Sequence, residues 1–188
     1  MMWYADDLVP ITLDDVKAAA EKCEAWRIFL HWSAGRYGQI WEDYHINIDE
    51  DGSLYTIGDL DFDVKKNHTW QRNTGSIGIS LCCAYEAQAN NGYDAEYGDY
   101  PPTQAQIDAM AMVVATICKY GRINIDNVLT HQEIATIDDY GPGSGDPETR
   151  WDLWFLPDSA YKDEHGNIVM KQGGSVIRGK ARWFMQYV

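Results

Sequence analysis

The stretch WRIFLHWSAG, residues 26–35, joins an apolar run to a polar residue and then to a loop of small residues. A short run of the composition of Ile28, Phe29 and Leu30 is typical of a buried β-strand. His31 closes the run, and side chains at the end of a strand, next to a loop, often line a cleft. The stretch therefore predicts a buried strand that carries His31 as a candidate functional residue.

A second run of the same kind, NVLT at 127–130, leads into His131, and a Gly/Pro-rich loop with Asp146 follows. Two histidines and a carboxylate would give three ligands and one open position, the coordination of a hydrolytic zinc. The residues alone leave a second interpretation open, because a histidine at a strand end is often only hydrogen-bonded, and Asp146 before Pro147 could start a turn. The local zinc signatures H-E-x-x-H and paired C-x-x-C are absent from the sequence.

Hydrophobic periodicity and capping residues along the chain favour an α/β fold. We expect a single mixed central sheet flanked by helices, with the metal site in a surface cleft. We expect helices over 12–22 and 104–120, strands near 26–31, 44–49, 53–57 and 77–82, and a loop over 87–99. The 188 residues fit a single domain, with a core of about 25–156 and a C-terminal extension, 157–188, packed on it.

Charge and composition narrow the class of partner. The net charge of −14 argues against nucleic acid as a ligand, and no apolar run is long enough for membrane insertion. The acidic N-terminus lacks the apolar segment of a secretory signal. The basic residues after residue 170 could contact an anionic substrate. Alternatively, their positive charge could simply offset the negative charge of the rest of the protein. The four cysteines are expected to be reduced thiols.

Four blocks in order resemble the zinc-dependent N-acetylmuramoyl-L-alanine amidases of the type-2 class, the family of amidase-type phage lysozymes and peptidoglycan recognition proteins. The blocks are IFLHWSAG at 28–35, DYHINIDEDGSLY at 43–55, His68 followed by NTGSIGIS at 73–80, and LTHQEIA at 129–135 closed by GDP at 145–147. Each block is weakly specific alone, whereas four in the family's order are strongly specific.

The resemblance implies that His31, His131 and Asp146 bind Zn²⁺ and that Tyr44 lies beside the metal as an oxyanion donor. Some members carry a Glu at the position of Ser80 or a Lys at the position of Ser144. With hydroxyls at both positions, the resemblance implies that Tyr44 or a water held by Ser144 assists the proton transfers, and the identity of the general base stays open.

The resemblance also implies the substrate, peptidoglycan or a muropeptide, cleaved at the amide between N-acetylmuramic acid and L-alanine. His68, Trp32 and Asn73 are the expected substrate contacts. The expected protein is a monomer, either an endolysin or a wall-remodelling enzyme. It would be made in the cytoplasm and reach the wall by lysis, a holin or another route independent of Sec. A peptidoglycan-binding module that has lost catalysis is the alternative.

Overall fold

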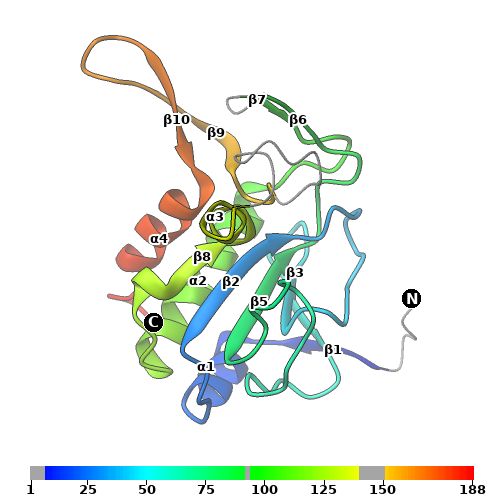
Figure 1. Cartoon of the computed structure of the whole chain (residues 1–188). Helices are drawn as coiled ribbons and strands as arrows, with labels where there is room; N and C mark the ends of the chain where they lie inside the picture. Colours follow the sequence, from blue (N-terminus) through cyan, green and yellow to red (C-terminus); the bar gives the residue numbers. More distant parts are fainter. Residues whose placement is uncertain (1–6, 92–93, 140–150) are drawn as a thin grey trace.

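The computed structural model describes residues 7–91, 94–139 and 151–188, and a six-stranded mixed sheet lies at its centre (Figure 1). In spatial order the strands are β1 (Leu8–Ile11), β4 (Leu54–Ile57), β3 (Ile46–Ile48), β5 (Ser76–Leu81), β2 (Arg27–Trp32) and β8 (Val128–Thr130). The four strands from β3 to β8 are parallel, and β4 and β1 continue the sheet antiparallel. The predicted mixed sheet is confirmed.

Four helices pack around this sheet. They are α1 (Leu13–Ala20), α2 (Gln104–Tyr120), α3 (His131–Ile137) and α4 (Gly173–Phe184). Helix α2 lies against β3 and β5 and is flanked by α1 and α4, whereas α3 lies against β2 and β8. No helix of the described part of the chain is long and apolar enough to cross a membrane.

Helix α2 shows how the sequence sets the layer beneath the sheet. Thr103 and Gln106 form the predicted start of the helix as a capping box, each side chain accepting a hydrogen bond from the other residue's backbone N–H. The Gln106 amide also donates to the carbonyls of Ile48 and Cys82, both at 3.1 Å. These two bonds tie the helix N-terminus to the ends of the central strands, so α2 is held in register with the sheet.

Strand β2 is the central strand that presents the functional face. Its side chains alternate, so Ile28 and Leu30 join the main hydrophobic core, whereas Phe29 and His31 point to the other face. Phe29 is fully buried there, with its ring centroid 6.0 Å from that of His68. The alternation therefore delivers His31, at the carboxyl end of the strand, to the side away from α2.

Three local expectations differ from the structure. The segment 87–99 is not a loop throughout, because β6 (Gln88–Asn91) and β7 (Asp94–Glu96) form a short hairpin whose polar residues carry no alternating apolar pattern. The strand expected at 44–49 is only β3, and Tyr44 precedes it. The chain also continues past the core into a projecting hairpin, β9 (Phe155–Lys162) with β10 (Ile168–Gln172), which leads into α4 (Figure 1). The four cysteines are free thiols, as expected.

Candidate metal centre

Three side chains from distant segments converge at the carboxyl end of the parallel strands. His31 is the penultimate residue of β2, His131 begins α3, and Asp152 lies just before β9. Their ligand atoms all lie within 4.8 Å of one another. The Oδ2 atom of Asp152 is 3.0 Å from His31 Nδ1 and 3.2 Å from His131 Nδ1. The three residues are only 0, 8 and 9 % exposed, respectively, so this is a buried cluster of possible metal ligands.

The sheet register brings the two histidines together. Leu30 of β2 pairs with Thr130 of the parallel strand β8, so the residues that follow both strands emerge side by side. Thr130 then caps α3 by accepting a hydrogen bond from the backbone N–H of Glu133, and the Glu133 carboxylate accepts one from the Thr130 N–H. This capping box turns the chain sharply after β8 and fixes His131 as the first helical residue.

Asp152 is held by a turn rather than by a strand. The backbone N–H of Trp154 donates to the carbonyl of Trp151 at 2.9 Å, and Leu153 adopts a left-handed backbone with φ of +60°. Trp151 and Leu153 are buried on either side of the carboxylate. A carboxylate enclosed by apolar side chains needs partners, and the two histidines provide them.

The protonation states fit a divalent cation. Burial lowers the pKa of His31 to about 4, so its ring is neutral at pH 7. Burial would raise the pKa of Asp152, but the charge interaction with His131 and the hydrogen bonds to both histidines hold it below its usual range, so the carboxylate is ionised. Neutral imidazoles and an ionised carboxylate are the forms that bind metals.

One atom of the cluster lacks any partner. Among the described residues, nothing hydrogen-bonds the buried Nε2 of His131. A buried polar atom left unpaired costs free energy, so such an atom calls for an unseen partner. Independently of that atom, two imidazole nitrogens with one carboxylate oxygen form a donor set that zinc accepts. The His31–His131–Asp152 group can therefore hold a metal.

A hollow of about 270 Å³ opens over the cluster, and Tyr44 lines it together with Trp32, His131 and Asp152. The Tyr44 ring centroid lies 5.2 Å from that of His31. Burial raises the pKa of the Tyr44 phenol, while a hydrogen bond with Ser80 opposes that shift in part. The phenol thus keeps its proton at neutral pH and can act as a hydrogen-bond donor toward the hollow.

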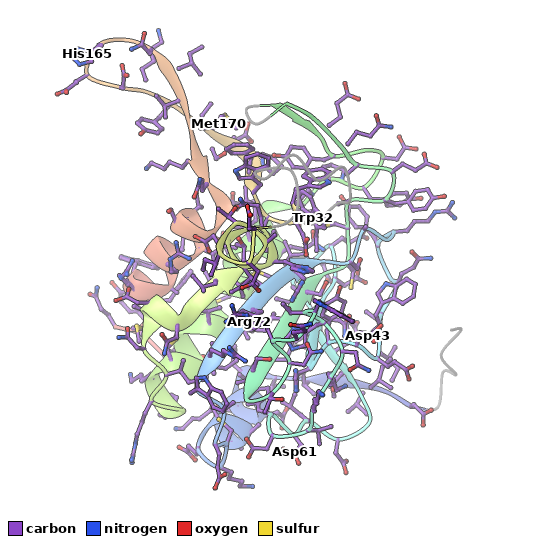
Figure 2. The ribbon with its side chains drawn as sticks, viewed as in Figure 1. Trp32, Asp43, Asp61, Arg72, His165 and Met170 are labelled. Carbon is purple, nitrogen blue, oxygen red and sulfur yellow. The ribbon has the colours of Figure 1, made fainter. Side chains whose placement is uncertain are left out.

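Of the three predicted substrate contacts, Trp32 is 6 % exposed and packs edge-on against Trp151, forming a wall of the hollow. Figure 2 shows it at the carboxyl end of β2. His68 lies behind the cluster, with its Nδ1 3.2 Å from His31 Nε2, and burial lowers its pKa to about 2. His68 and Asn73 line a second hollow of about 480 Å³. The structure thus places Trp32 and His68 beside the cluster and Asn73 in the second hollow, and their contact with substrate stays a prediction.

Two predicted site residues, Ser144 and Asp146, lie outside the described residues. The structure places Asp152 with the two histidines, a residue that the sequence analysis did not propose. One signal could have found it: Asp152 is the only charged residue in the otherwise apolar run WDLWFL at 151–156. A carboxylate within such a run is buried only when it is paired.

Comparison with known proteins gives one finding. A family model described as N-acetylmuramoyl-L-alanine amidase matches residues 13–147. The match includes His31, His131 and Tyr44, whereas Asp152 and α4 lie beyond its end. No curated protein matches the chain.

Proposed function

Since this chain belongs to the N-acetylmuramoyl-L-alanine amidase family, we propose that His31, His131 and Asp152 hold a catalytic zinc ion in a peptidoglycan amidase. The observation that carries the proposal is the convergence of three ligand atoms within 4.8 Å of one another in a buried cluster. Zinc, when bound, supplies a Lewis acid that polarises the scissile carbonyl and acidifies a water molecule.

The chain's own residues then serve the hydrolysis of the amide between the lactyl group of N-acetylmuramic acid and L-alanine. Tyr44 keeps its proton, so its hydroxyl can donate a hydrogen bond to the negative charge that develops on the carbonyl oxygen. Asp152 contributes Oδ2, which lies 3.0 Å from His31 Nδ1 and 3.2 Å from His131 Nδ1. His68 supports His31 from the opposite side. The departing amine needs a proton, and Ser144, outside the described residues, remains the proposed holder of a water for that step.

The two hollows suit the two halves of the substrate. The apolar walls formed by Trp32 and Trp151 favour the stem peptide. The second hollow carries the amide of Asn73 and the indole of Trp70, which is 68 % exposed. Exposed aromatic faces beside amides are suited to sugar rings, so we assign this hollow to the N-acetylmuramic acid side.

The test uses purified peptidoglycan and the metal-stripped protein. We expect one zinc per chain on titration, release of new L-alanine amino groups only after zinc is added, and loss of that release with a chelator. His31→Ala should neither bind zinc tightly nor release amino groups. Wall binding without amino-group release in the zinc-loaded protein would instead favour the non-catalytic binding module.

The biological setting is a separate part of the proposal. We assign the chain to an endolysin or a wall-remodelling enzyme that acts as a monomer and is made in the cytoplasm, reaching the wall by lysis, a holin or another route independent of Sec. Turbidity loss of intact cells after external addition supports a lytic role. Activity confined to soluble muropeptides contradicts it and favours a remodelling or recycling role.

A further inference from the structure

The last helix described, α4, lies outside the family match. It nevertheless contacts the two segments that carry ligands of the metal centre, which are the start of α3 with His131 and the turn with Asp152. Helix α4 packs on α2, β8 and β9. Each of its cations has a carboxylate partner: Arg178 pairs with Glu133, Lys180 with Asp108, and Arg182 with Asp126. Only the first of these pairs reaches the helix that begins with His131. The basic residues expected either to touch substrate or to offset acids therefore form specific links to the body of the protein.

The Arg178–Glu133 pair is a two-pronged, largely buried contact. The guanidinium donates to both carboxylate oxygens of Glu133 at 2.8 Å and to the carbonyl of Val128 at 2.9 Å. The Oε2 atom of Glu133 at the same time accepts the backbone N–H of Thr130 at 2.8 Å. A continuous chain of bonds thus runs from α4 through the capping box of α3 to the residue that precedes His131.

The first turn of α4 supports the carboxylate side of the centre as well. The N–H of Gly173 donates to the carbonyl of Trp154 at 2.8 Å, on the turn that carries Asp152. A Cβ on Gly173 would stand 2.2 Å from the Leu153 carbonyl oxygen, and one on Gly174 would stand 2.5 Å from Glu133 Oε2. Only glycines allow this helix end to approach both supports so closely.

We propose that Arg178 is a positioning residue of the metal centre, which locks Glu133 into the cap of α3 and thereby holds His131 against Asp152. The proposal rests on the zinc site put forward above. Without Arg178, the Glu133 carboxylate would be buried without its cation, a costly state that is relieved when the carboxylate swings out to solvent. The capping box would then open, and the first turn of α3, with its ligand, would lose its fixed orientation.

A matched pair of variants on the same helix tests the proposal. Arg178→Met removes the link to α3, whereas Lys180→Met removes a single, more exposed ion pair with Asp108 of α2 that does not touch the centre. We expect Arg178→Met to weaken zinc affinity about 10- to 100-fold, the range for residues that orient metal ligands, and to lower kcat with little change in KM. Arg178→Lys should restore only part of the affinity, because an ammonium cannot bind both oxygens as a fork does.

Lys180→Met should lower the melting temperature of the zinc-free protein by less than Arg178→Met does, because its ion pair is more exposed, and it should keep wild-type zinc affinity within about twofold. Equal zinc affinities for the two Met variants would overturn the proposal, and a wild type that binds no zinc would overturn the zinc site itself. The two failures are therefore distinguishable.

A second pair covers the case in which Arg178→Met does not fold. Gly174→Ala pushes a methyl group against Glu133 Oε2, whereas Gly179→Ala on the same helix meets nothing within 4 Å. We expect weaker zinc binding, about tenfold, for Gly174→Ala only. Unchanged affinity in Gly174→Ala, with its helix content intact, would also overturn the proposal.

Discussion

The two sides of the metal centre are built on different principles. His31 lies near the carboxyl end of β2 and His131 follows the neighbouring parallel strand β8, so backbone pairing places them together before any side chain is considered. Asp152 sits in a turn with a left-handed residue beside it and is held from outside by the first turn of α4. The position of a ligand that is fixed by sheet register follows from the local sequence pattern of the strands. The position of a ligand in a turn depends instead on which residues pack against that turn.

The largest expected effect separates the two candidates for the carboxylate side. Asp152→Asn should lower zinc affinity by more than about 100-fold, beyond the cost of changing an orienting residue, and abolish amide hydrolysis, because the amide carries no charge to balance the metal. Asp146→Asn is the matched variant, and zinc titration with amino-group release reads out both. The converse result, loss in Asp146→Asn alone, would move the third ligand into the segment outside the described residues.

The second prediction concerns the histidine side of the hollow. Tyr44→Phe should lower kcat about 10- to 1,000-fold, the range for loss of one oxyanion donor, and leave zinc content and melting temperature unchanged. Ser80→Ala serves as the control, since it removes the hydrogen bond to the Tyr44 phenol but keeps the donor itself. Full activity of Tyr44→Phe on cross-linked peptidoglycan would show that the hydroxyl takes no part.

The third prediction concerns pH and the sheet beneath the histidines. His45 accepts the Gly78 N–H at Nδ1 and donates from Nε2 to the Val64 carbonyl, so the fold holds its neutral form. Burial lowers its pKa to about 4. Because the folded pKa lies below the ordinary 6.5, this stability is present above pH 6.5 and is lost as the pH falls toward 4. The loss amounts to about 3 kcal/mol at most.

Urea unfolding of the metal-free protein at pH 7 and pH 4.5 measures this effect. His45→Gln should reduce the decrease in unfolding free energy between pH 7 and pH 4.5. His165→Gln, at the exposed tip of the projecting hairpin (Figure 2), should leave it unchanged. An identical pH dependence in wild type and His45→Gln would mean that His45 does not hold a neutral form in the fold.

The smallest expected effect is a gain in the free energy of unfolding from a substitution in α4, the helix that packs against the turn of Asp152. Gly179 is exposed within α4, has no positive φ, and a Cβ there meets nothing within 4 Å. Gly179→Ala should therefore stabilise the protein by about 0.5–1 kcal/mol, because the alanine loses less backbone freedom on folding. Thermal unfolding measures the gain, and a destabilised Gly179→Ala would contradict the packing seen around α4.

The sequence pattern predicted those elements whose formation depends on residues close together in the chain. The capping box at Thr103 and the apolar run before His31 each fix an element within a few residues, and both elements lie where expected. Helix α4 gave no such signal, because its N-cap Gln172 makes no side-chain capping bond and its first residues are two glycines. It is held instead by packing on α2 and by the pair between Arg178 and Glu133, 45 residues away. Asp152 was missed for the same reason, since its place depends on tertiary contacts.

The distance along the chain between the two sides has a consequence for the order of folding. His31 and Asp152 are 121 residues apart, so their contact closes a long loop of chain and can form only late. A chain growing from its N-terminus carries both histidines long before α4 has been synthesised to brace the turn of Asp152. A zinc ion at this centre would tie the early part of the chain to the late part, as a disulfide does. It would favour the folded state by about 2.7 kcal/mol at one hundred times its dissociation constant. At the proposed zinc site, amide hydrolysis would therefore begin only after α4 has docked against the turn that carries Asp152.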